Sequence, residues 1–81
     1  MKRLRYDDIK IDDLLKVRVY DGGLTDTIIE GRVTNKDGQN VMLNVFCYFT
    51  PEDPEGIITS DYEAFNPDYA RAYKIEENTR I

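Results

Sequence analysis

The sequence contains no histidine and only one cysteine, Cys47. Without an imidazole the chain has no histidine acid–base catalyst and no histidine ligand for zinc, and one thiol cannot build a structural zinc site. A single cysteine also forms no disulfide within the chain, and no signal peptide is recognisable. We therefore expect an intracellular, cytoplasmic protein with no metal or other cofactor.

Tryptophan and long hydrophobic runs are missing too, and positive charge is in the minority. Tryptophan is a common component of grooves that bind proline-rich peptides, so that class is disfavoured. No apolar run approaches the roughly 18 residues of a membrane-spanning helix, and no membrane contact is expected. The 16 Asp and Glu against 11 Lys and Arg give a net charge of −5, which disfavours binding to a phosphate backbone.

What the sequence does contain is enough for one small folded domain. Hydrophobic residues make up 41% of the 81 positions and charged residues 33%, which is ordinary for a globular protein. We expect residues 1–81 to form a single domain, with residues 1–8 as an N-terminal lead-in and residues 76–81 frayed.

Alternation of apolar and polar residues predicts β-strands at residues 14–20, 27–34, 40–50, 57–65 and 73–75. Residues 40–50 are apolar on both faces, which is typical of a central or covered strand. Period two places Phe46 and Tyr48 on the face opposite the core. The predicted core consists of Leu15, Val17, Val19, Ile29, Val33, Val41, Leu43, Val45, Cys47 and Ile57.

The stretch GRVTNKDGQNVMLNV at residues 31–45 predicts a hairpin. A two-residue loop at Asp37-Gly38 would place Arg32 opposite Leu43, beside the core. A three-residue loop, Lys36 to Gly38, keeps the apolar residues on one face, so we predict that loop, with Gly38 in a left-handed conformation. The expected pairs are Val33 with Val41, Gly31 with Leu43, and Ile29 with Val45. Gly31 is expected to mark a bend or bulge.

Asn66-Pro67-Asp68 is a helix-start pattern, with Asn66 as the N-cap and Pro67 in the first position. Few residues follow, so we predict one helical turn before the last strand. The fold class is therefore all-β: a small barrel or strongly bent sheet of five antiparallel strands.

Two segments carry a family resemblance, Ile11–Val19 and the strand–turn–strand pattern from Val17 to Val45. Over residues 9–49 the sequence resembles the small SH3-like and Sm-like β-barrels. Asp12 stands where many SH3-like barrels have the glycine of a Gly-Asp pair. The RNA-contacting Asp and Asn of the Sm family and its later Arg-Gly signature have no counterpart. The resemblance therefore implies architecture only and carries no binding residues over.

The aromatic residues are the first candidate for a binding site. Phe46 and Tyr48, together with Tyr20, would form an exposed platform that grips a protein or stacks on bases. The alternative is that this face is covered by the N-terminal segment, by the C-terminal turn or by another copy of the chain.

Arg18 and Arg32 lie on the polar faces of the first two predicted strands. They either form a small basic stripe or make cross-strand ion pairs with Glu30. The leading hypothesis is a non-enzymatic protein-binding or accessory module, with another protein or a second copy of the chain as partner, using the Phe46/Tyr48 face or an unpaired strand edge. The alternative is a single-stranded RNA- or DNA-binding barrel that uses the same aromatics with these arginines.

The acidic clusters at residues 7–13 and 52–55 do not have the ligand spacing of a calcium loop. Capping and solubility explain them, and imitation of a nucleic-acid backbone for a basic partner is a minor alternative. Cys47 is expected to be an inert buried thiol. No nucleophile has a recognisable base partner, so we do not expect an enzyme.

Overall fold

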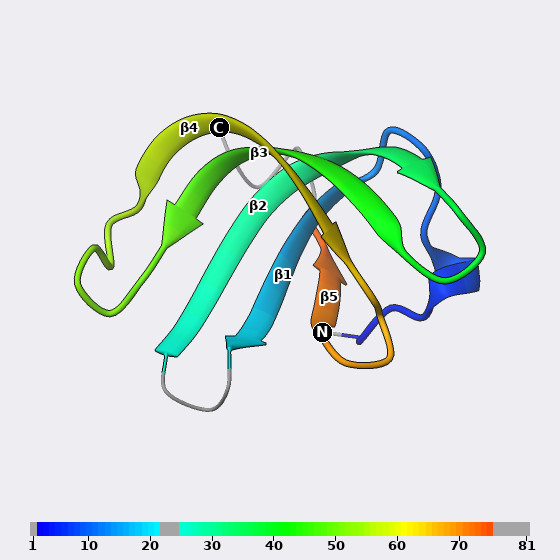
Figure 1. Cartoon of the computed structure of the whole chain (residues 1–81), viewed down its shortest axis with the longest axis horizontal. Coiled ribbons are helices and arrows are strands. Elements are labelled where there is room, and N and C mark those ends of the chain that lie inside the picture. The colour runs from blue at the N-terminus through cyan, green and yellow to red at the C-terminus, as the bar shows by residue number, and fades with distance from the viewer. Residues whose placement is uncertain (1, 22–24, 76–81) are drawn as a thin grey trace.

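The structure is a computed structural model, which describes residues 2–21 and 25–75. In these residues a 3-10 turn, η1 (Tyr6–Asp8), precedes five strands: β1 (Leu14–Asp21), β2 (Thr25–Lys36), β3 (Val41–Phe49), β4 (Ile57–Phe65) and β5 (Arg71–Lys74). All pairings are antiparallel, and the sheet order is β4-β3-β2-β1-β5 (Figure 1). The all-β prediction is confirmed. The fraying predicted for residues 76–81 lies outside the described residues.

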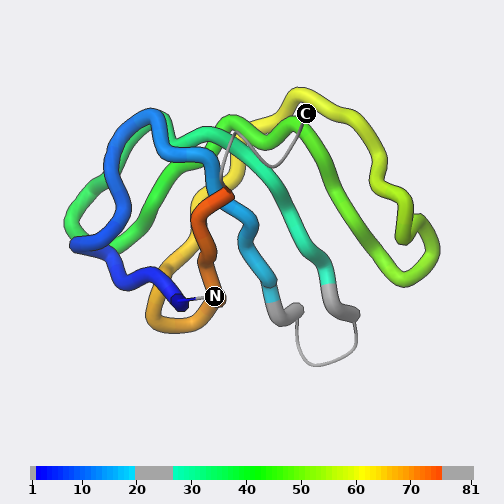
Figure 2. Tube along the Cα trace, turned by 180° about the vertical axis from the view of Figure 1, so that it is seen from behind, coloured from blue at the N-terminus to red at the C-terminus, as the bar shows by residue number. Residues whose placement is uncertain are grey.

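The sheet is strongly bent, and hydrogen bonds do not close it into a barrel. β4 and β5 are the two ends of the strand order, and the described residues contain no β4–β5 pairing. The strands arch over the core, and the loop of residues 50–56 stands at the end away from the N-terminal segment (Figures 1 and 2). This arrangement is consistent with both predicted architectures, a strongly bent sheet and a small barrel.

The core lies on one face of this sheet, which we call the core face; the opposite face is the outer face. Nine of the eleven buried hydrophobic residues are less than 5% exposed, with Phe65 and Ala70 at 6% and 5%. Seven predicted core residues are confirmed, and Val19 packs against them half-buried. The complete buried set is Ile9, Leu15, Val17, Ile29, Val33, Val41, Leu43, Val45, Phe65, Ala70 and Ala72.

Two core predictions are wrong, and both concern the far end of the β3–β4 hairpin. Ile57 is 48% exposed, and Cys47 is half-buried outside the core cluster. Ile57 pairs with Tyr48 at the start of β4, and the displacement of Cys47 is caused by a β-bulge in β3. Val45 pairs with Gly31 and Cys47 with Glu30, so Phe46 is an extra residue in β3. An extra residue inverts the alternation beyond it, which turns Cys47 away from the core face.

The hairpin register also differs from the prediction. Val33 pairs with Leu43 and Gly31 with Val45, two residues further along β3 than expected, and Ile29 pairs with Tyr48. The strands end at Lys36 and Val41, so the loop has four residues, 37–40. The Asp37 carboxylate accepts hydrogen bonds from the backbone of Gln39 and Asn40, and this local turn chemistry favours the longer loop. A shift of two residues keeps Gly31 and Val33 on the core face.

Two glycine predictions in this hairpin are confirmed. Gly38 has φ +97°, the region that glycine enters without steric cost. Gly31 sits at a register shift, where a Cβ atom would stand 2.7 Å from the carbonyl oxygen of Asn44. The backbones of β2 and β3 therefore approach so closely that only glycine fits.

The turn before β5 follows the predicted capping pattern. The Asn66 side chain accepts a hydrogen bond from the Asp68 backbone, and the Asn66 carbonyl accepts from Tyr69 and Ala70. This single turn leads into β5, which pairs with β1. It also brings Ala70 and Ala72 into the core, which the sequence did not reveal because alanine carries a weak strand and core signal.

The N-terminal segment joins the two sides of the sheet. Leu4 donates a backbone hydrogen bond to the carbonyl of Ala72, and Ile9 is 1% exposed in the core. The Lys36 ammonium lies 4.1 Å from the centre of the Tyr6 ring and donates to the carbonyl of Ile9. The lead-in is therefore an ordered part of the domain. In the described part of the chain no helix is long and apolar enough to cross a bilayer.

Candidate functional site

The most exposed regular element is the edge strand β4. Of its nine residues only Phe65 is buried, and only Thr59 is half-buried. β3 pairs with one side of β4, and no described residue pairs with the other side. Edge strands normally carry lysine, proline or other devices that prevent pairing with a second chain. β4 contains neither lysine nor proline, so among the described residues nothing blocks strand addition at its unpaired edge.

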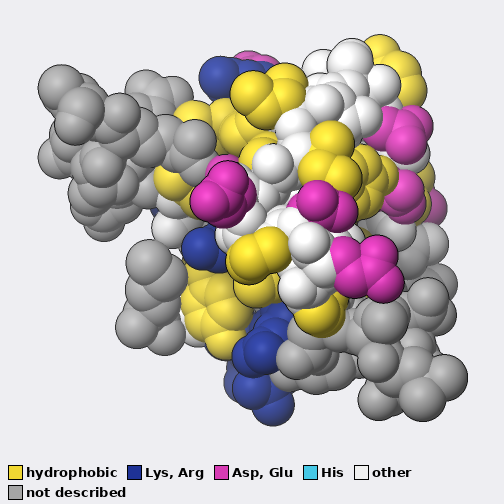
Figure 3. Space-filling model, turned by 90° about the vertical axis from the view of Figure 1, so that its left-hand side faces the viewer, with side chains coloured by type: hydrophobic (Ala, Val, Ile, Leu, Met, Phe, Trp, Pro, Cys, Tyr) yellow, Lys and Arg dark blue, Asp and Glu magenta, His cyan; other side chains and the backbone are white. Residues whose placement is uncertain are grey.

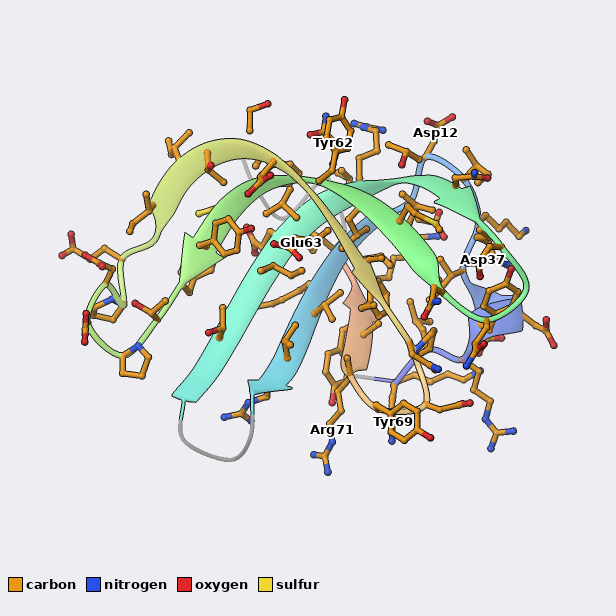
Figure 4. The ribbon with its side chains drawn as sticks, in the orientation of Figure 1. Asp12, Asp37, Tyr62, Glu63, Tyr69 and Arg71 are labelled. Carbon is orange, nitrogen blue, oxygen red and sulfur yellow. The ribbon has the colours of Figure 1, made fainter. Side chains whose placement is uncertain are left out.

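The outer face of β4 presents two large apolar side chains to solvent. Ile58 is 88% exposed and Tyr62 77%. Ile58 lies opposite Cys47 and Tyr62 opposite Asn44 in the pairing with β3. In Figure 4 the Tyr62 ring points away from the arch, whereas Glu63 lies beneath it. Exposed apolar side chains beside an unpaired backbone edge are typical of a binding surface.

The core face of β4 carries two carboxylates between Ile57 and Phe65. Asp61 pairs with Val45 and Glu63 with Leu43, so both side chains share the face of the core. The Tyr48 hydroxyl reaches them from β3, at 2.9 Å from a Glu63 oxygen and 3.4 Å from an Asp61 oxygen. Because a phenol has one proton to donate, it satisfies one carboxylate at a time.

These contacts change how Tyr48 titrates. Burial, the hydrogen bond to Glu63 and the negative charges of Glu63 and Asp61 raise the pKa of Tyr48 to about 12. Each of these causes disfavours the charged phenolate. Tyr48 therefore remains a neutral hydrogen-bond donor to the carboxylates at ordinary pH.

Charge is distributed unevenly along the chain and across the fold. Residues 37–70, which include β3 and β4, contain seven of the 16 Asp and Glu and none of the 11 Lys and Arg. The remainder holds nine acidic and eleven basic residues. Figure 3 shows hydrophobic and acidic side chains side by side at the end of the molecule that carries the loop of residues 50–56. The β4 side of the sheet is thus apolar and acidic.

The predicted aromatic platform does not form as expected. Because Phe46 is the bulged residue, Tyr48 falls on the core face opposite Ile29 and packs against the core. The shared face predicted for Phe46 and Tyr48 is therefore wrong. Phe46 itself is half-buried. The side chain of Tyr20, the third member of the predicted platform, lies outside the described residues.

The two predicted arginines lie on neighbouring strands. Arg32 donates a hydrogen bond to the carbonyl of Asp12 at 3.1 Å. Arg18 pairs in register with Ile28 of β2 and Arg71 of β5. Glu30 pairs with Lys16 and is only 7% exposed. Arg32 pairs with Asn44, two residues before Phe46 in β3, and Glu30 pairs with Cys47, the residue after it.

A pocket of about 370 Å³ opens beside the loop of residues 50–56. The Lys16 ammonium lies 5.9 Å from the centre of the Phe49 ring at this site. Gly56 closes over Cys47 and Phe49, where a Cβ would stand 2.8 Å from the thiol sulfur. The lining residues are Lys16, Ile28, Phe49, Thr50, Pro51 and Pro54. Lys16 is the one charged residue among those that line the pocket, and none of them is paired with a catalytic base. We therefore propose no reaction or ligand for this pocket.

Metal binding receives no support from the described residues, which contain no group of three or more metal-ligating side chains. The Asp37 carboxylate, for example, is occupied by backbone donors. Hydrogen bonds from Asn40 and Gln39 lower the pKa of Asp37, because they stabilise its charged form.

Comparison with protein-family models, with curated proteins and with solved structures found no match. The candidate site is therefore defined by the physical features of β4 alone.

Sequence reasoning named an unpaired strand edge but did not say which strand would provide it. Strand order is a long-range property, and the pattern within residues 57–65 does not contain it. Two features of the sequence nevertheless pointed to this strand. Residues 37–70 contain no Lys or Arg, and alternation along a strand places Ile58 and Tyr62 on one face and Asp61 and Glu63 on the other.

Proposed function

We propose that this protein is a non-enzymatic protein-binding module whose interface is the unpaired edge of β4. The observation that carries the proposal is a nine-residue edge strand without lysine or proline, on which Ile58 and Tyr62 are more than three-quarters exposed. A partner segment would add a further strand to the sheet, with backbone hydrogen bonds supplying affinity and side chains supplying specificity.

The architecture is consistent with this role. The strand order, the glycine-bearing bend in β2 and the turn before β5 support assignment to the SH3-like or Sm-like barrels as a proposal about fold family. The free thiol of Cys47 supports action in a reducing compartment such as the cytoplasm.

The test is a selection from a displayed library of random nonapeptides. Peptides enriched on the wild-type protein should fail to bind an Ile58→Lys/Tyr62→Lys variant, because lysine on an edge strand opposes strand addition. Both positions are so exposed that the variant should fold normally. A Tyr69→Lys variant is the matched control, since Tyr69 is 81% exposed and lies outside β4.

Two results would contradict the proposal. Enriched peptides that bind the lysine variant as well as they bind the wild type would place the interface elsewhere. Binding of single-stranded oligonucleotides that weakens steeply with salt, with no peptide enriched, would favour the nucleic-acid alternative.

A further inference from the structure

We infer that the partner of the β4 edge is an extended segment of another protein in which basic and apolar side chains alternate. The inference rests on the proposed function and adds the chemistry of the partner. Its basis is the different character of the two faces of β4 at the point where a new strand would pair.

The two faces of β4 determine which side chains of a paired strand lie beside which side chains of β4. In a strand pair, residues directly opposite one another project to the same face of the sheet. Asp61 and Glu63 project to the core face, and Ile58 and Tyr62 to the outer face. At Asp61 and Glu63 a bound strand would therefore place its core-face side chains beside carboxylates, and at Ile58 and Tyr62 its outer-face side chains beside apolar groups.

The two carboxylates are exposed, and residues 37–70 around them carry no cationic side chain. No Lys or Arg occurs between Lys36 and Arg71. The neutral Tyr48 hydroxyl lies 2.9 Å from a Glu63 oxygen and 3.4 Å from an Asp61 oxygen, donates to one of them at a time, and removes neither charge. An arginine or lysine on a paired strand would lie next to them, and a guanidinium offers several donors to such a pair.

A second copy of the chain fits this edge poorly. An antiparallel β4–β4 pair centred on Tyr62 would place Asp61 opposite Glu63 twice, and one centred on Asp61 would bring the two Asp61 side chains together. Like charges directly opposite one another destabilise a strand pair. Other registers still gather four carboxylates on one face without a cation, between two chains that each carry a net charge of −5.

The test uses three synthetic nonapeptides: one alternates arginine and valine, one has the same composition in two blocks, and one alternates glutamate and valine. Binding is measured by fluorescence anisotropy at low and high salt, and the site is mapped by NMR shifts of backbone amides. The alternating basic peptide should bind about tenfold more tightly than the block peptide, with the largest shifts in β4.

The variant Asp61→Asn/Glu63→Gln should weaken binding of the alternating basic peptide about five- to tenfold and reduce its salt dependence. Glu52→Gln/Asp53→Asn is the matched control, because it removes the same charge from the exposed loop of residues 50–56. That control should change affinity less than about twofold.

The outcomes separate the inference from the function on which it rests. If the acidic and basic alternating peptides shift β4 equally, strand addition stands and the inference is overturned. If no peptide shifts β4, both fail. If light scattering shows a dimer that Ile58→Lys/Tyr62→Lys dissociates, the partner is a second copy and the inference is overturned. A selective loss in Asp61→Asn/Glu63→Gln supports it.

Discussion

The two ends of the β3–β4 hairpin contain similar hydrophobic residues but bury them differently. The end away from the connecting loop of residues 50–56 is formed by residues 41–45 and 61–65, and we call it the closed end because other segments cover it. Here Val41, Leu43 and Val45 are fully buried, and Phe65 joins the same cluster. At the open end, formed by residues 46–50 and 56–60, the larger side chains are half-buried, and Ile58 is almost wholly exposed.

The difference teaches that burial here depends on what lies opposite each residue rather than on its hydrophobicity. The closed end faces the N-terminal segment, the turn before β5 and β5 itself, which contribute Ile9, Ala70 and Ala72 to the same cluster. The open end extends beyond these elements (Figure 1). Stability should therefore be concentrated at the closed end, and binding at the open end and along β4.

The largest expected change in the free energy of unfolding comes from truncating a buried side chain at the closed end. Leu43→Ala should lower the free energy of unfolding by about 2–5 kcal/mol, because it leaves a cavity among fully buried side chains. Ile58→Ala, the counterpart at the open end, should change it by less than about 0.5 kcal/mol. Urea unfolding followed by circular dichroism measures both, and equal losses in the two variants would erase the distinction between the ends.

A second comparison uses one glycine at each end: Gly31 of β2, which pairs with Val45 at the closed end, and Gly56 at the open end. Gly31→Ala should cost about 1–3 kcal/mol, since its Cβ would collide with the rigid backbone of Asn44. Gly56→Ala also meets close atoms, but they belong to the side chains of Cys47 and Phe49, which can move. Its cost should be about 1–2 kcal/mol from the positive φ of 95°.

The same urea experiment ranks the two glycine variants. The expected order is Gly31→Ala less stable than Gly56→Ala. The reverse order would mean that the open end is packed as rigidly as the closed end.

A pH experiment addresses the Tyr48 contacts with the carboxylates of β4. The pKa of Tyr48 is about 12 in the folded protein and about 10 in an unfolded chain. The folded state thus disfavours ionisation, so this stabilisation is complete below about pH 10 and is lost as pH rises toward 12. Tyr48→Phe should remove this part of the pH dependence, and parallel profiles for the two proteins between about pH 10 and 12 would contradict it.

The smallest effect is expected in the loop of residues 37–40 at the closed end. Backbone hydrogen bonds from Asn40 and Gln39 hold the pKa of Asp37 below its usual 3.8. The stabilisation from this carboxylate is present above that pH and declines as pH falls below it. NMR titration should show a late-protonating carboxyl that is missing from Asp37→Asn, whose side-chain oxygen still accepts the bonds. An ordinary titration midpoint for Asp37 would contradict the loop geometry.

Local periodicity was sufficient to predict the strands. Residues 57–65 were predicted with the bounds that β4 has, and the predicted apolar face of residues 14–20 is the buried face of β1. The predicted faces of the residues after Phe46 in β3 were wrong, because one extra residue inverts the alternation. Nothing in the apolar run of residues 41–49 marks where this bulge occurs. Ile57 pairs with Tyr48 on the core face and is exposed because it lies at the open end, beyond the segments that cover the core.

The candidate site was less predictable than the strands. Tyr48 was named from its strand, but its contact with Asp61 and Glu63 depends on the bulge and on the position of β4 beside β3. Ile9, Ala70 and Ala72 reach the core only when distant segments meet. Pairing partners across the chain are set by the whole fold, and a pattern of period two contains no information about them.

The contact between Leu4 and Ala72 also has a consequence for the order of folding. The two residues are 68 positions apart in the sequence, and β1 pairs with β5 over a similar span. Such distant pairing slows folding, because the entropy lost in closing a long loop precedes the contacts that compensate for it. During synthesis the β1–β3 meander can form early, but the edge of β1 stays uncovered until residue 72 has left the ribosome. The most stable end of the finished molecule should therefore be among the last parts to be completed.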